Sequence, residues 1–168
     1  MSMITRSGIG YDVHRLAPAE DDRPLVLGGV KFRHPEGMIL VGHSDADVLC
    51  HAIADAILGA AGLQDIGHYF PNTDASLRGI SSLEILRRTA GIIADAGGRI
   101  INVDSTLIAE SPKIGPFVGE MRELIAESLG IDSTRVGVKA TTNEALGFLG
   151  RGEGIAALGI ASVETPAE

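Results

Sequence analysis

Residues 47–61 read DVLCHAIADAILGAA, and this stretch decides which fold the rest of the chain can form. Its apolar residues recur every three or four positions, which is the period of one face of a helix. Ser44 and Asp45 stand just before it and are candidates for the capping residue. The spacing predicts a helix from Asp47 to Ala61, with an apolar face made of Val48, Leu49, Ala52, Ile53, Ala56, Ile57 and Ala60.

The residues before this helix have the two-residue period of strands. GIGYDVH (8–14) alternates apolar and polar side chains, which predicts a strand. PLVLGGVKF (24–32) indicates a short hairpin, because two apolar runs flank a two-glycine turn. Residues 1–7 are expected to be a disordered start.

After the first helix the chain alternates between helices and strands. A capping box at Ser81 and Glu84 predicts a second helix that ends at Gly97-Gly98. A third helix is predicted from Pro112 to Leu129, because proline is favoured in a first helical turn. Strands are predicted at Ile100–Ile108, Val136–Ala140 and Ile155–Val163. The order predicts a single α+β domain over residues 1–168: two layers, a mixed, mainly four-stranded sheet covered on one face by three helices, and a short N-terminal hairpin.

The composition restricts the classes of partner. With 14 basic and 22 acidic residues the formal charge is −8, so we expect no broad cationic surface for nucleic acid. A single cysteine, Cys50, excludes an intramolecular disulfide and fits a reducing compartment. No window has the ~18 uninterrupted apolar residues of a membrane span, and no secretory signal is present. We therefore expect a soluble cytoplasmic protein that binds neither membrane nor nucleic acid.

Three residues form a candidate metal site. Asp12 and His14 project from the same face of the predicted strand, about 7 Å apart along it. His51 lies on the predicted helix and adds a second imidazole. Three protein ligands that leave a fourth position open are typical of a catalytic zinc site. His43 lies outside the helix and is better placed over a ligand than on the metal.

An alternative is that the polar residues of the helix are only its solvated side. Asp47, His51 and Asp55 are four residues apart and form one polar stripe. A solvated stripe would more naturally contain lysine, arginine or glutamate, and none of these occurs between Gly42 and Leu77. The composition therefore favours the metal site.

A glycine-rich segment is a candidate phosphate site. Residues 139–154 read KATTNEALGFLGRGEG, in which backbone N–H groups, Thr141, Thr142 and Arg151 could bind phosphate oxygens. Glu144 would repel a phosphate unless it held Mg²⁺ between itself and a diphosphate. The segment is not a P-loop, and a hairpin loop with incidental charges remains an alternative.

Five segments together resemble the 2-C-methyl-D-erythritol 2,4-cyclodiphosphate synthase family. They are GYDVH (10–14), HSDADVLCHA (43–52), LQDIGHYFPNTD (63–74), NVDSTLIAESPKIGP (102–116) and VKATTNEALGFLGRGEG (138–154). The resemblance implies an enzyme of non-mevalonate isoprenoid biosynthesis. Its substrate would be 4-diphosphocytidyl-2-C-methyl-D-erythritol 2-phosphate, whose 2-phosphate attacks the diphosphate, closes the ring and expels CMP.

The resemblance also implies roles for particular residues. Asp12, His14 and His51 would hold Zn²⁺, and Glu144 would help to hold Mg²⁺ or Mn²⁺ on the diphosphate. His43 and Thr142 would be catalytic. The implied substrate-binding residues are Asp12, His14, His43, Ser44, Asp65, Ile66, Gly67, Phe70, Pro71, Asn72, Thr73, Asp74, Ala109, Glu110, Ser111, Pro112, Lys113, Ile114, Gly115, Thr141, Thr142, Asn143, Glu144, Phe148 and Arg151, with 109–115 as the cytidine pocket.

The resemblance further implies a homotrimer with active sites between subunits. Two other functions remain open from the residues. A zinc phosphohydrolase would use a metal-bound water, but no clear base stands near the proposed water. A non-catalytic trimer could bind nucleotides or an isoprenoid metabolite, but both candidate metal sites are intact.

Overall fold

The computed structural model describes residues 2–167 and shows two layers. A mixed sheet has the strand order β4-β1-β7-β5-β6, in which only the β5–β6 pair is parallel. Its strands are β1 (Met3–Pro18), β4 (Met38–Leu40), β5 (Arg99–Ile108), β6 (Val136–Thr141) and β7 (Gly154–Pro166). A separate hairpin consists of β2 (Leu25–Leu27) and β3 (Val30–Phe32), as predicted.

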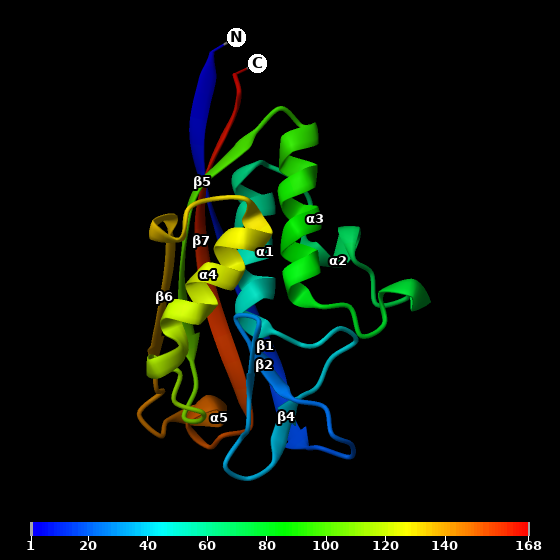
Figure 1. Ribbon diagram of the computed structural model, residues 1–168, viewed down its shortest axis with the longest axis vertical. Coiled ribbons are helices and arrows are strands. Elements are labelled where there is room, and N and C mark those ends of the chain that lie inside the picture. Colours follow the sequence, from blue (N-terminus) through cyan, green and yellow to red (C-terminus); the bar gives the residue numbers. More distant parts are fainter. Residues whose placement is uncertain (1, 168) are drawn as a thin grey trace.

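Three long helices cover one face of the sheet, as the element order predicted (Figure 1). They are α1 (Val48–Ala60), α3 (Ser82–Asp95) and α4 (Val118–Leu129). Helix α1 packs on β1 and β7, α4 packs on β6, and α3 contacts both helices. Short helices α2 (Ile66–Tyr69) and α5 (Gly147–Gly150) and 3-10 turns at Ala75–Leu77, Gly115–Phe117 and Ser133–Arg135 complete the elements. No helix in residues 2–167 is long and apolar enough to cross a membrane.

The sheet is larger than the sequence predicted. It has five strands and not four, because β4 adds to the edge of β1 through the register Leu16↔Leu40. The expectation of a disordered start was also wrong for residues 3–7. They are the first part of β1, because the end of β7 offers an antiparallel partner from Ser162 to Pro166. Residue 1 lies outside the described part of the chain.

The third helix begins later than predicted. Helix α4 begins at Val118, and Pro112 and Lys113 belong to the loop before it. A helix that began at Pro112 would need the N–H of residue 116 to bond the carbonyl of residue 112. Residue 116 is a second proline, which has no N–H and whose ring would collide with that carbonyl. The short 3-10 turn at Gly115–Phe117 therefore precedes the helix.

The N-terminus of α1 is capped by Asp47, not by Ser44 or Asp45 as the sequence suggested. The Asp47 carboxylate accepts the N–H of Cys50 at 3.2 Å. It is fully buried and also accepts the N–H groups of the hairpin turn residues Gly28 at 2.9 Å and Gly29 at 2.7 Å. Because both turn glycines have positive φ, the turn directs its two donors at one carboxylate.

The polar stripe of α1 is not a solvated surface. Asp47 is buried, and Asp55 accepts the N–H of Ile66 at 2.8 Å, which attaches α2 to α1. His51 points toward β1 and is mostly buried. The three stripe residues therefore have separate partners on three different segments.

Glycines let α1 approach the sheet closely. A β-carbon at Gly10 would collide with the carbonyl oxygen of Ala52, and one at Gly8 would collide with that of Ala56. On β7, a β-carbon at Gly159 would lie 2.7 Å from the carbonyl oxygen of Ala52. Since these contacts are with helix backbone, no side-chain rotation could relieve them. The glycines therefore set the distance between α1 and β1.

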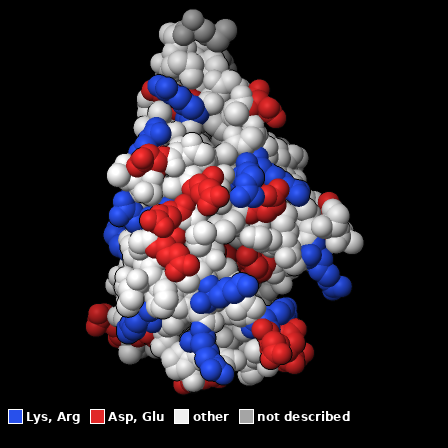
Figure 2. Space-filling view, in the orientation of Figure 1, with Lys and Arg blue, Asp and Glu red and all other residues white. Residues whose placement is uncertain are grey.

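The side of the molecule covered by the helices and the opposite face of the sheet differ in the polarity of their exposed side chains. Figure 2 shows acidic and basic side chains interspersed over the side covered by the helices. The opposite face of the sheet presents apolar pairs from β1 and β7, with Ile9 opposite Ile160 and Tyr11 opposite Leu158. Ile9 is 71% exposed and Ile160 is 50% exposed. A contiguous exposed apolar sheet face of this kind marks an interaction surface.

We expect Gly10→Ala to lower the free energy of unfolding by about 3 kcal/mol, the upper end for overpacking, because the new methyl group meets helix backbone. Urea unfolding followed by circular dichroism would measure the change. The matched control is Gly91→Ala in the middle of α3, where a β-carbon meets nothing within 4 Å. The control should be neutral or stabilising by up to about 1 kcal/mol. Equal stability of the two variants would contradict the proposed constraint.

Candidate functional site

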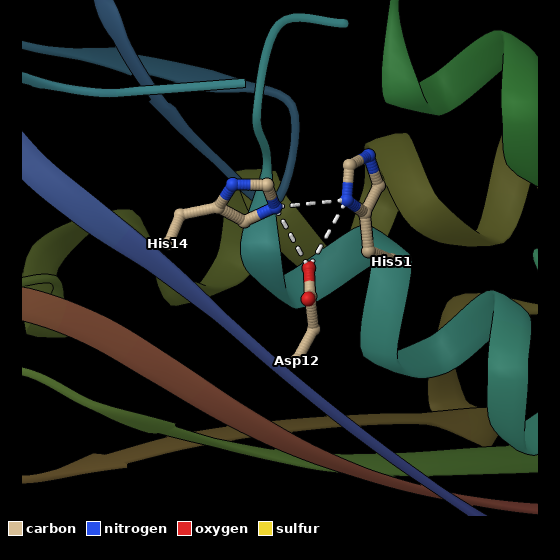
Figure 3. A group of neighbouring side chains, drawn as sticks. All are labelled: Asp12, His14 and His51. Carbon is tan, nitrogen blue, oxygen red and sulfur yellow. Dashed lines mark hydrogen bonds and ion pairs between the residues drawn. The ribbon is translucent and has the colours of Figure 1, made fainter. Parts of the chain in front are cut away.

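The side chains of Asp12, His14 and His51 converge on one point (Figure 3). Oδ2 of Asp12 lies 2.9 Å from Nε2 of His14 and 3.1 Å from Nδ1 of His51, and the two nitrogens are 3.2 Å apart. Ligand atoms about 2.0–2.1 Å from a tetrahedral zinc would be about 3.3 Å apart. The donor set therefore fits a divalent metal, and these three are the only such group found among residues 2–167.

The strand and helix that carry these three residues direct their side chains toward one another. Asp12 and His14 are two residues apart on β1 and so share the face toward α1. His51 is one turn into α1, above the glycine-lined contact with β1. Nδ1 of His14 lies 2.8 Å from the carbonyl oxygen of Val41 and donates to it, which leaves Nε2 free to bind a metal.

The electrostatics of the trio also suit a cation. Burial by itself would raise the pKa of Asp12, but the polar contacts and charges of His14 and His51 hold this pKa well below its usual range. Burial disfavours the charged ring of His14, but the hydrogen bond and charge of Asp12 raise the pKa of His14 above its ordinary value. A divalent cation between the three ligand atoms would be stabilised by the ionised carboxylate of Asp12.

The three side chains line a cleft of about 370 Å³. His43 and Ser44 line the same cleft, and Nε2 of His43 lies 3.2 Å from the carbonyl oxygen of Asp74. Of the implied site residues, the cleft brings together Asp12, His14, His43, Ser44, His51, Ile66, Gly67, Phe70 and Asn72. Its other lining residues are mainly apolar. The cleft thus combines several convergent polar groups with an apolar lining of similar extent, and a concave site with a few placed polar groups is typical of small-molecule sites.

Four implied residues beside this cleft do not line it. Asp65 caps α2 by accepting the N–H of His68, and Asp74 caps a 3-10 turn by accepting the N–H and hydroxyl of Ser76. Pro71 and Thr73 lie in the same loop, outside the lining. The carboxylates of this loop therefore stabilise its shape in the present structure.

A second group of implied residues lies at the carboxyl ends of the parallel strands β5 and β6. The loop after β5 includes Glu110, whose Oε1 accepts the N–H of Asn143 at 2.9 Å and of Ala145 at 3.4 Å. The segments Ala109–Gly115 and Thr141–Arg151 are therefore joined within one chain. Glu110, Ser111 and Arg151 line a separate hollow of about 230 Å³. None of the residues that line the cleft around Asp12 comes from these two segments.

Glu144 and Arg151 of the second group each contact a side chain two residues away. Glu144 has a positive φ of 53°, and its Oε1 accepts the hydroxyl of Thr142 at 3.3 Å. Arg151 forms an exposed ion pair with Glu153 at 2.6 Å. Phe148 is 45% exposed. The segment therefore presents a carboxylate, a guanidinium and an aromatic ring at the surface, as a loop that binds a ligand would.

Two features near the trio could not be predicted from the sequence: a contact of Ser82 with His51, and a second hollow. Ser82 lies 31 positions from His51 in the sequence, yet its Oγ contacts Nε2 of His51 at 2.9 Å. A larger hollow of about 740 Å³ adjoins the cleft, shares His43 and Ser44 with it, and is lined by Arg23 and Arg78 among others. Neither feature follows a local pattern in the sequence that could have identified it.

Comparison with known families places the chain unambiguously. The model of the YgbB family matches residues 5–164. The 2-C-methyl-D-erythritol 2,4-cyclodiphosphate synthase of Akkermansia muciniphila is 57% identical over 98% of this chain and 95% of its own. The enzyme of the same name from Symbiobacterium thermophilum is 56% identical over 93% of this chain and 96% of its own.

Solved structures give the same result. IspF of Plasmodium falciparum, solved in complex with CDP, has a TM-score of 0.80 and 34% identity and covers 98% of this chain and 97% of its own. The bifunctional IspDF of Campylobacter jejuni has a TM-score of 0.89 and 43% identity over 98% of this chain, which corresponds to 43% of the bifunctional chain. The chain therefore belongs to the YgbB family, the family of the 2-C-methyl-D-erythritol 2,4-cyclodiphosphate synthases.

Proposed function

We propose that this protein converts 4-diphosphocytidyl-2-C-methyl-D-erythritol 2-phosphate into 2-C-methyl-D-erythritol 2,4-cyclodiphosphate and CMP. An oxygen of the 2-phosphate forms a bond to the phosphorus nearer the erythritol, and the bond from that phosphorus to the oxygen of CMP breaks. The observation that carries the proposal is the convergence of Asp12, His14 and His51 in a cleft of a chain that belongs to this family. The CDP bound to the Plasmodium falciparum relative supports a cytidine substrate.

The chemistry needs alignment more than it needs a base. A phosphate monoester has a second pKa of about 6, so the attacking phosphate is already largely dianionic at neutral pH. The main obstacles are the repulsion between phosphates and their orientation. Groups that hold two phosphates in line and neutralise their charge are therefore sufficient to explain the catalysis.

We assign zinc to the trio, because one carboxylate and two imidazoles are ligands that zinc prefers. Zinc bound there would position and polarise a substrate phosphate oxygen. Glu144 would help to hold Mg²⁺ or Mn²⁺ on the diphosphate, since hard cations prefer oxygen ligands. His43 and Ser44 line the same cleft and would orient a phosphate, and Thr142 would stabilise the transition state beside Glu144.

We also propose that the working enzyme is a homotrimer with active sites between subunits, in the cytoplasm. Two observations support the assembly. The trio lines one hollow, whereas Glu110 and Ser111 of the proposed cytidine pocket and the substrate-binding candidate Arg151 line another, so a second copy could complete each site. In addition, the exposed apolar face that includes Ile9 and Ile160 would be covered by such contacts.

We expect the protein with Zn²⁺ and Mg²⁺ to release CMP and the cyclic diphosphate from the cytidylyl substrate, as followed by phosphorus NMR. His51→Ala should lose bound zinc and turnover together, because one of three ligands is removed. Normal zinc content and rate in that variant would show that the ligands are wrongly assigned. Release of inorganic phosphate in place of CMP would indicate a phosphohydrolase, and ligand binding without turnover would indicate a binding protein.

Glu144→Gln should distinguish the site of zinc from the site of Mg²⁺. We expect this variant to keep its zinc, because Glu144 is not among the three converging ligands. Turnover should fall and require more Mg²⁺, since an amide binds this cation more weakly than a carboxylate. Steady-state rates over a range of Mg²⁺ concentrations would measure the effect, with Glu127→Gln on the exposed side of α4 as a control. An unchanged Mg²⁺ requirement would contradict the assignment.

Ile9→Glu should prevent trimer formation, because burying a carboxylate in an apolar interface is unfavourable. We expect sedimentation to show a monomer that retains zinc but releases no CMP. The control Ala94→Glu adds the same charge on the exposed side of α3 and should remain a trimer. A trimeric, active Ile9→Glu variant would show that this face is not the interface.

A further inference from the structure

The two ring nitrogens of His51 have different surroundings. Nδ1 points at the other two ligands, 3.1 Å from Oδ2 of Asp12 and 3.2 Å from Nε2 of His14. Nε2 points the opposite way, 2.9 Å from Oγ of Ser82 and 3.2 Å from Oγ of Ser44. Only a nitrogen without a proton can bind a metal. The position of the single proton on a neutral His51 ring therefore decides whether Nδ1 can act as a metal ligand.

Ser82 is connected on its other side to Asp45. The Ser82 hydroxyl donates a hydrogen bond to Oδ1 of Asp45, and the Ser82 N–H donates to Oδ2 at 2.9 Å. Ser82 is fully buried at the start of α3. The Asp45 N–H also donates to the carbonyl oxygen of Ile80 at 3.1 Å, so the two segments are joined in both directions.

The hydrogen count then leaves one arrangement for His51. A serine hydroxyl has one hydrogen, and that of Ser82 is donated to Asp45. The contact between Ser82 Oγ and His51 Nε2 is therefore a hydrogen bond only if Nε2 carries the proton and donates it. With the proton on Nε2, the lone pair is on Nδ1, which is the nitrogen that faces Asp12.

We propose that Asp45 and Ser82 are positioning residues that hold His51 in the tautomer able to bind metal through Nδ1. The proposal rests on the metal site assigned above, and extends it by two residues that bind neither metal nor substrate. The tautomer of His14 is fixed in the same way by the backbone carbonyl of Val41, which accepts the hydrogen on Nδ1. The two histidines therefore present different nitrogens, and each is fixed by a partner on its far side.

The arrangement has a consequence for Ser44. Because Nε2 of His51 is a donor, it cannot accept the Ser44 hydroxyl hydrogen. Oγ of Ser44 already accepts the N–H of Ala46 at 3.1 Å. The hydroxyl hydrogen of Ser44 is thus left to donate into the cleft, where a phosphate oxygen would be an acceptor.

The tautomer can be tested first on the unaltered protein. Nitrogen-15 NMR of the imidazole groups in the zinc-loaded protein should show His51 protonated at Nε2, with a proton that exchanges slowly because it is buried and hydrogen-bonded. A proton on Nδ1 of His51 would overturn the proposal. This measurement uses no variant, so it does not depend on the folding of one.

The role of Ser82 can be tested by Ser82→Ala. We expect zinc binding, measured by competition with a chromophoric chelator, to weaken by about 10–100-fold. The Nε2 proton of His51 should also exchange faster, which a merely structural change would not cause. The matched control is Ser128→Ala, which removes another buried helical hydroxyl, one that donates to the Leu124 carbonyl far from the trio in sequence. Zinc binding in Ser82→Ala within about twofold of the unaltered protein would overturn the proposal.

These outcomes are distinguishable from a failure of the proposed function. An unaltered protein that bound no zinc would overturn the metal site and, with it, the role of Ser82. If the unaltered protein bound zinc and Ser82→Ala bound it more weakly, but no CMP were released from the cytidylyl substrate, only the cyclase reaction would be contradicted.

Discussion

The close backbone contact between helix α1 and strand β1 is the constraint on which the rest of the structure depends. Gly8 and Gly10 on β1 and Gly159 on β7 have no side chain to separate the strands from the helix. A helix at this distance can place His51 within hydrogen-bond reach of Asp12 and His14. If the helix were displaced outward by the width of a methyl group, the three ligand atoms could not share one cation, since zinc ligands must lie within about 2.2 Å of the metal.

Buried polar contacts then hold the N-terminal half of the helix in its orientation. Asp47 joins the first turn of α1 to the β2–β3 hairpin, and Asp45 joins the preceding loop to α3 through Ser82. Both carboxylates have several N–H or O–H partners, which offsets the cost of removing them from water. One end of the candidate metal site is thereby fixed by segments distant in the sequence, and a ligand on a rigid element needs little reorganisation when a cation binds.

The single chain holds two groups of candidate site residues in separate hollows. One has the trio Asp12, His14 and His51 with His43 and Ser44, and the other has the loops at the ends of β5 and β6, joined by Glu110. The apolar sheet face lies opposite the helices and leaves apolar cross-strand pairs in water. Covering that face with further copies of the chain would remove apolar area from water and could bring one group to the other. Assembly and catalysis would then depend on the same surface.

The sequence by itself determined most of the elements and the candidate ligands Asp12, His14 and His51, because both are expressed in local spacing. Alternation placed Asp12 and His14 on one strand face, and the helical period placed His51 on one helix face. The tertiary structure alone decided which features depend on distant partners. Residues 38–40 form strand β4 because the end of β1 offers them a partner, and the first residues of β1 are a strand because they pair with the end of β7. Asp47 is a buried cap because the hairpin turn directs two N–H groups at it, and Ser82 contacts His51 because α3 packs beside α1. Such contacts depend on chain segments meeting in space, and no periodicity in the sequence records them.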